Sequence, residues 1–213
     1  YDGTPLLYVG INGSVIAGDY VGTYASQVAS GKLSSGWHMA VIEEYAASPG
    51  SFYMNLYLDG KYIGTANLSS YLPQLFGAAP NPPLNGIYGY PFGYIGEGPG
   101  GYHFRSTFPR HYFFYNGTIA IVAFYNALLP TNVISQMWTE SQITSNGISV
   151  YLPTQNLVVA YVLSPSFFNS TNGTLSPYYV NSTAMSELGI TNPDLILISS
   201  GSNLHDNIWA DYM

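Results

Sequence analysis

The sequence predicts an all-β protein, an antiparallel two-sheet jelly-roll sandwich with one short helix. Apolar residues alternate with other residues in most segments, which is the spacing of a half-buried strand. Asn-Gly and Asp-Gly pairs separate these segments, as hairpin turns do, and the 213 residues include 23 Gly and 14 Pro. One segment alone shows the three- and four-residue apolar spacing of a helix. Many short strands joined by frequent turns are typical of sandwiches and jelly rolls.

The first third of the chain predicts two hairpins and one further strand. Asn12-Gly13 forms the turn of the first hairpin, and Asp59-Gly60 forms the turn of the second. In the strand that opens at Trp37, alternate residues face opposite sides of a sheet. The strands predicted in this part span residues 6–9, 14–17, 37–45, 52–58 and 61–65.

The rest of the chain predicts shorter strands and the one helix. Residues 72–104 are rich in Gly, Pro and Tyr, which indicates long loops around short strands. Asn116-Gly117 is expected to join two paired strands. Thr131 is expected to cap the helix, whose apolar face holds Val133, Ile134, Met137 and Trp138. The strands predicted here lie at 94–95, 112–115, 118–125, 148–152, 157–163 and 195–198.

The charge of the chain is low and negative. Four Lys and Arg stand against 11 Asp and Glu, a formal net charge of −7 at pH 7. So few cations cannot neutralise a useful number of phosphates, and we expect no nucleic-acid partner. The longest apolar run, residues 157–163, is far shorter than the about 20 residues that span a bilayer, and we expect no membrane span. A surface wetted by groups that do not titrate in acid is typical of proteins from hot, acidic habitats, such as those of thermoacidophilic archaea.

Six Asn-X-Ser/Thr sequons indicate an exported glycoprotein, because they are about twice as frequent as the composition predicts. The alternative is that Asn-Gly-Thr serves only as a turn. The chain has no cysteine, and it opens on Tyr1, which fits a processed export product or a trimmed chain. We expect an extracellular or cell-surface location, with glycans at Asn12, Asn67, Asn116, Asn169, Asn172 and Asn181.

Four segments follow one another in a distinctive order within about residues 30–140. They are SGWHMAVIEEY, FYMNLYLDGKYIGT, FGYIGE and FYNGTIAIVAFYNALLPTNVISQMW. This order resembles that of the laminin-G-like, concanavalin-A-like domains, and the resemblance implies a two-sheet jelly roll. The chain departs from the pattern at two points. Only 36 residues precede Trp37, where such domains have additional strands, and the closing strand around Val122 is uncharged.

The predicted domains are a laminin-G-like β-sandwich at 1–150 and a C-terminal β segment at 151–213. Residues 156–174 look like the opening strand of such a sandwich, displaced to its C-terminal side. Three interpretations stay open: the segment completes the same sandwich by permutation, forms a further module, or pairs with a neighbouring subunit as an added strand. Repeated donation of that strand from copy to copy would build an open filament.

The motifs of catalysis are missing from the sequence, and we predict neither an enzyme nor any catalytic residue. Glu43 and Glu44 are adjacent on a predicted strand, so they point to opposite faces and cannot flank one bond. Gly96, Gly98 and Gly101 match a dinucleotide-binding spacing, but no helix follows them. The histidines are scattered and show no metal-binding spacing, at His38, His103, His111 and His205.

We expect no cofactor, with calcium as the one alternative that the resemblance implies. Laminin-G-like domains often hold calcium through an Asp and backbone carbonyls. Asp19 and Asp59 are the nearest candidates, but Asp59 already has a conformational role in its predicted turn. Isolated carboxylates also fall short of the six to eight oxygens that the ion prefers. No tight metal site is predicted.

Tyrosine is the remaining candidate for function, with 21 residues in the chain. Its side chain joins a broad apolar face to a hydroxyl, which suits sugar stacking, packing on another subunit, or simply stiffening loops. The tyrosines in or beside the Gly/Pro loops are Tyr88, Tyr90, Tyr94, Tyr102, Tyr112 and Tyr115. The leading hypothesis is a non-catalytic structural or adhesive protein that self-associates into a homopolymer. The alternative is a carbohydrate-binding, lectin-like module.

Overall fold

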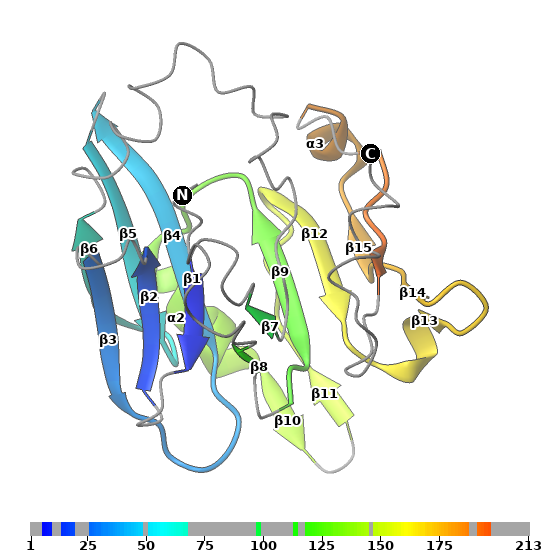
Figure 1. The fold of residues 1–213 in the computed structure, drawn as a ribbon, viewed down its shortest axis with the longest axis horizontal. Helices are drawn as coiled ribbons and strands as arrows, with labels where there is room; N and C mark the ends of the chain where they lie inside the picture. Colours follow the sequence, from blue (N-terminus) through cyan, green and yellow to red (C-terminus); the bar gives the residue numbers. More distant parts are fainter. Residues whose placement is uncertain are drawn as a thin grey trace, which may run out of the picture. The chain divides into compact units, whose positions relative to one another are not determined.

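The described residues form antiparallel sheets and two short α-helices (Figure 1), which confirms the predicted all-β class and adds one helix to the single helix predicted. The computed structural model describes residues 6–9, 14–19, 26–48, 51–67, 97–98, 113–114, 118–144, 147–187 and 191–196. The strands of the first half are β1 (Leu6–Val9), β2 (Ser14–Asp19), β3 (Ser26–Lys32), β4 (Ala40–Ser48), β5 (Ser51–Leu58), β6 (Lys61–Asn67), β7 (Glu97–Gly98) and β8 (Phe113–Phe114). Those of the second half are β9 (Ile121–Tyr125), β10 (Gln142–Thr144), β11 (Gly147–Ser149), β12 (Leu157–Val162), β13 (Phe168–Asn169), β14 (Thr174–Leu175), β15 (Tyr179–Val180) and β16 (Leu195–Ile196). The helices are α2 (Thr131–Glu140), the short 3-10 helix η2 (Pro165–Phe167) and α3 (Ser182–Glu187).

The chain divides into two compact units that interleave along the sequence. The first unit takes residues 1–117 and 128–153, and the second takes 118–127 and 154–213. Residues 118–127 belong to the second unit because β9, which they contain, pairs with β12. The sequence prediction had one boundary, after residue 150, whereas the chain passes between the units at three places.

The first unit contains two three-stranded sheets that share one apolar core. Their strand orders are β1-β2-β3 and β4-β5-β6. In a strand every second side chain points to the same face, so the alternating apolar residues of β2 and β5 turn inward together. The core consists of Val15, Ala17, Met54, Leu56 and Ala66, with Val28, Leu33, Ala40, Ile42 and Leu58 packed against it.

The strand pairs of both hairpins predicted in the first third of the chain are confirmed. β1 pairs antiparallel with β2, whose predicted turn at Asn12-Gly13 lies outside the described residues, and β5 pairs antiparallel with β6 around Asp59 and Gly60. These two turn residues have φ angles of 51° and 76°, so the chain uses the Asp-Gly pair where a left-handed backbone is needed. The strand predicted at 37–45 begins later, at Ala40, and runs on to Ser48.

Helix α2 lies where it is predicted, but its N-terminus is not capped as predicted. Thr131 is the first helical residue rather than the cap, and the residue before it is Pro130. The carbonyl oxygen of Pro130 accepts hydrogen bonds from the N–H groups of Val133 and Ile134. These bonds start the helix without a side-chain cap. The Thr131 hydroxyl instead hydrogen-bonds to the side chain of Tyr57. The residues that α2 buries are Ile134 and Met137, as the apolar spacing predicts.

The strand pair predicted around Asn116-Gly117 is wrong in its partners. β8 pairs with β7, and β9 pairs with β12. The strand predicted at 148–152 is the shorter β11, which pairs with β10. The strand predicted at 157–163 is confirmed as β12, whereas the one predicted near residues 94–95 lies outside the described residues.

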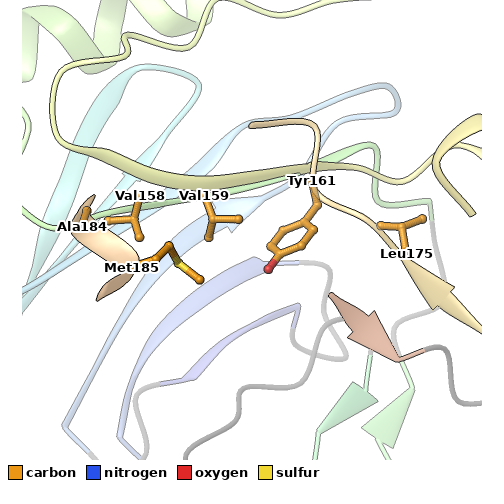
Figure 2. Close-up of a cluster of buried hydrophobic side chains, with 6 residues drawn as sticks. All are labelled: Val158, Val159, Tyr161, Leu175, Ala184 and Met185. Atoms are coloured by element: carbon orange, nitrogen blue, oxygen red, sulfur yellow. The ribbon is translucent and has the colours of Figure 1, made fainter. Parts of the chain in front are cut away.

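The second unit is built around β12, a strand with apolar residues on both faces. Its sheet has the order β15-β12-β9, and a second small sheet has the order β13-β14-β16. Figure 2 shows the buried side chains Val158, Val159, Tyr161, Leu175, Ala184 and Met185, the last two from α3. Helix α3, the other α-helix of the described residues, was not predicted from the sequence and lies within a stretch rich in Ser, Thr and Asn.

Candidate functional site

The outer face of the β4-β5-β6 sheet carries a cluster of hydrogen-bonded polar and paired aromatic side chains. It is the face opposite the apolar core, and the strand register arranges its side chains in rows that run across the three strands. We define the outer face by Glu43 and Tyr45 from β4, Tyr53, Asn55 and Tyr57 from β5, and Tyr62, Thr65 and Asn67 from β6. Glu43, Asn55 and Thr65 form the middle row, and Tyr45, Tyr53 and Asn67 form one end row.

The middle row begins at Glu43, a carboxylate that is only 8% exposed. One of its oxygens accepts a hydrogen bond from Asn55 Nδ2 at 3.2 Å. The other accepts one from the backbone N–H of Leu129 at 2.9 Å, just before α2. Tyr57 also hydrogen-bonds to Glu43, and burial is the main cause that raises the pKa of the Tyr57 hydroxyl. A carboxylate with three donors is well satisfied despite its burial.

The rest of the row has a fixed order of donors and acceptors. Thr65 Oγ1 donates to Asn55 Oδ1 at 2.6 Å, which uses the only hydrogen of that hydroxyl. In the 2.5 Å bond between Tyr62 and Thr65 the donor is therefore the Tyr62 hydroxyl. Since Tyr62 is 53% exposed, the row ends at the surface in a phenolic oxygen that can still accept a hydrogen bond.

Two aromatic pairs flank the middle row. Tyr45 and Tyr53 are stacked, with ring centroids 5.7 Å apart and an interplanar angle of 28°. Tyr57 and Tyr62 meet edge to face, with centroids 5.5 Å apart. The accessible part of the outer face thus consists of aromatic rings, amides and hydroxyls, while its one carboxylate is buried. Such a surface suits contact with a neutral ligand or with another protein.

A second cluster joins His38 to the turn of the β5-β6 hairpin. His38 Nδ1 lies 2.8 Å from Asp59 Oδ2, and the backbone N–H of Met39 donates to Asp59 Oδ1 at 3.0 Å. His38 Nε2 lies 3.1 Å from the carbonyl oxygen of Ser34. The hydrogen bond to Asp59 is the main cause that raises the pKa of His38. These bonds tie the segment before β4 to the hairpin turn.

Asp59, a calcium candidate in the sequence, has both carboxylate oxygens engaged by these protein contacts. The other candidate, Asp19, ends β2, and its side chain lies outside the described residues. In the part of the chain that the structure describes, no three or more His, Asp or Glu side chains are grouped to hold a metal ion.

We expect the His38–Asp59 pair to make stability depend on pH. Because the folded state raises the pKa of His38, the pair's contribution is fully present below the unfolded value of about 6.5. It is lost as pH rises through the higher, folded value. Urea unfolding measures the difference in unfolding free energy between the wild type and His38→Gln. This difference should favour the wild type more at pH 5 than at pH 8, by up to about 1 kcal/mol. Equal pH slopes in the two proteins would contradict the assignment.

The sequons fall in different surroundings. Asn67 is exposed at the end of β6, and Asn169 is exposed on β13. Asn172 lies in the β13-β14 turn, where its Oδ1 accepts a hydrogen bond from Thr174 Oγ1 at 2.7 Å. Asn181 is half-buried before α3, and its Oδ1 accepts one from the backbone N–H of Ala184 at 3.1 Å. Asn12 and Asn116 lie outside the described residues.

The six loop tyrosines singled out in the sequence, Tyr88, Tyr90, Tyr94, Tyr102, Tyr112 and Tyr115, also lie outside the described residues. The residues of the outer face were not predicted as a site from the sequence, although the pattern that places them on one face is present. Tyr53, Asn55 and Tyr57 alternate with the apolar residues that identify β5. Glu43 and Glu44 pair with Asn55 and Met54 respectively, on opposite faces as expected.

Comparison with known proteins adds no relative. No protein-family model, no curated protein and no solved structure matches the chain. The likeness to laminin-G-like domains therefore stays a prediction from the sequence. Within the described ranges, no helix has the length and apolar character needed to cross a membrane.

Proposed function

We propose that the protein is exported, N-glycosylated and non-catalytic, and that it serves at the cell surface as a structural or adhesive unit. The outer face carries this proposal, because its accessible part offers rings, amides and hydroxyls rather than charges. A laminin-G-like jelly roll is the proposed architecture. Two sheets with a common apolar core support it, as does the order of the four sequence segments.

The engagement of the titratable groups supports a non-catalytic role. Glu43 accepts hydrogen bonds from Asn55, Leu129 and Tyr57, so its lone pairs serve to hold three chain segments. His38 and Asp59 are bonded to each other and to the backbone of their neighbours. We therefore assign these groups the role of holding neighbouring segments together.

Strand exchange is the proposed route of assembly. β12 pairs with β9 along most of its length, and five of its six residues are buried. Between two copies the same ladder would form the same hydrogen bonds, so one copy could receive the C-terminal segment of the next. Repetition of this exchange gives a homopolymer without any new interface chemistry.

A cysteine pair tests this proposal, since the natural chain has none. Ile121 and Val162 are register partners on β9 and β12. Their Cα atoms should lie about 4.5–5.5 Å apart, a spacing that a disulfide can bridge. Under oxidation, sedimented polymers of Ile121→Cys/Val162→Cys should give a covalent ladder in a non-reducing denaturing gel. Each single variant is the control and should run as a monomer.

A protein that stays monomeric at high concentration, with its disulfide inside one chain, would contradict a structural polymer. Binding of a neutral hexasaccharide such as maltohexaose by that monomer would then favour the second candidate, a lectin-like module. The observation that favours this candidate is the pairing of Tyr57 with the exposed Tyr62 beside a free acceptor oxygen. Tyr62→Ala should abolish such binding.

A further inference from the structure

We propose that the first sugar of a glycan on Asn67 packs against the stacked Tyr45–Tyr53 pair, so that the protein's own glycan covers one end of the outer face. This inference rests on the proposed N-glycosylation. It assigns to one of the six sequons a role within the fold.

The strand register places the three side chains in one row. Asn67 on β6 is the partner of Tyr53 on β5, and Tyr53 is in turn the partner of Tyr45 on β4. Directly opposed residues have Cβ atoms about 4.5–5.5 Å apart, close enough for a group on Asn67 to reach the Tyr53 ring. Asn67 is exposed, and the two tyrosines are half-buried.

The stacking leaves one face of the Tyr53 ring available to a sugar, and this is the face on the side of Asn67. Because β5 lies between β4 and β6, the stacked Tyr45 ring covers the side of Tyr53 that looks toward β4. The opposite side of the Tyr53 ring looks toward β6, where Asn67 lies. The modified strand thus brings its glycan to an aromatic surface that the stack holds in place.

The chemistry of the two surfaces is complementary. The C–H groups on one side of a sugar ring are weakly positive, and the face of an aromatic ring is weakly negative. N-linked attachment uses Asn Nδ2 and leaves the backbone ladder between β5 and β6 in place. Packing also removes apolar surface of both rings from water, which stabilises the glycosylated fold.

The other described sequons differ in their neighbours. Asn169 faces Thr174 across the β13-β14 ladder. Asn172 lies in an exposed turn, and Asn181 uses its side chain at the start of α3. We expect their glycans to extend into solvent and to leave the stability of the fold unchanged.

The test is a cycle of variants made in a host that attaches N-linked glycans. Ser69→Ala removes the sequon and keeps Asn67 itself, and Tyr53→Leu removes the aromatic ring. In the wild-type background, Ser69→Ala should lower the Tm by about 2–4 °C, and in the Tyr53→Leu background it should have no effect. Thr171→Ala, which removes the Asn169 sequon, is the matched control and should have no effect in either background.

The outcomes distinguish the packing of the Asn67 glycan on Tyr53 from the more general proposal that the protein is N-glycosylated. Mass spectrometry of the peptide that contains residue 67 establishes occupancy before the Tm is measured. An equal loss in both backgrounds, or an unmodified Asn67 beside other occupied sequons, would overturn the inference and leave the proposed glycoprotein intact. A chain with no occupied sequon would overturn both. A glycan-dependent Tm that needs Tyr53 supports the inference.

Discussion

Glu43→Ala is expected to destabilise the protein by roughly 3 kcal/mol, because it leaves three donors without their acceptor, one of them on the buried Tyr57 and two on half-buried residues. The N–H of Leu129 and the Asn55 amide would lose bonds of 2.9 and 3.2 Å, and Tyr57 would lose its carboxylate partner. The effect should spread along the row, since Asn55 is held in the orientation that accepts from Thr65 only while its amide donates to Glu43. Urea denaturation of the purified variant measures the loss.

The neighbouring Glu44 provides the control. It is exposed on the opposite face of the same strand, and it shares the sequence context and charge of Glu43. Partial desolvation raises the pKa of Glu44, so removal of its charge by Glu44→Gln should change stability by less than about 0.5 kcal/mol. A similar loss in both variants would mean that the Glu43 contacts are not what stabilises the outer face.

Gly60→Ala is expected to cost roughly 2–3 kcal/mol, from two separate causes. The φ angle of Gly60 is 76°, a left-handed conformation that alanine adopts only with strain. An added Cβ would also lie 3.0 Å from Ser135 Cα and 3.1 Å from Trp138 Cβ, so the turn would be pushed away from α2. The helix backbone cannot yield as a flexible side chain would.

Thermal or urea unfolding would compare Gly60→Ala with Gly31→Ala. Gly31 lies in β3, has an ordinary φ, and has nothing within 4 Å of an added Cβ. Its substitution should change stability by less than about 1 kcal/mol, in either direction. If the two variants were equally stable, the close approach of the hairpin turn to α2 would not contribute to the fold.

The sequence predicts local structure well where a short-range signal is decisive. Asp59-Gly60 identifies a hairpin because both residues must adopt positive φ, and the spacing of Ile134 and Met137 identifies the buried face of α2. Thr131 was predicted to cap α2, but its hydroxyl instead hydrogen-bonds to Tyr57, a residue far away in the sequence. The short helix α3 is missed because its six residues are too few to show a period.

Strand partners and the outer face depend on contacts between distant segments, which periodicity does not encode. Asn116-Gly117 suggests a local hairpin, yet β9 takes β12 as its partner, since that strand offers a continuous apolar ladder. The importance of Glu43 comes from a bond to Leu129, a residue 86 positions away. Alternation alone places Tyr53 and Asn55 on one face, but it cannot say which residues lie across from them.

The interleaving of the two units has a consequence for synthesis on the ribosome. The nascent chain delivers β9 before residues 157–162, and the residues that bind Glu43 also precede β12 in the sequence. Contacts within the first unit can therefore begin to form cotranslationally while β9 still presents an unpaired ladder edge. During that interval a neighbouring nascent chain or a chaperone can compete for the same edge, so translation speed over residues 126–156 would influence how much of the protein leaves the ribosome as a self-contained monomer.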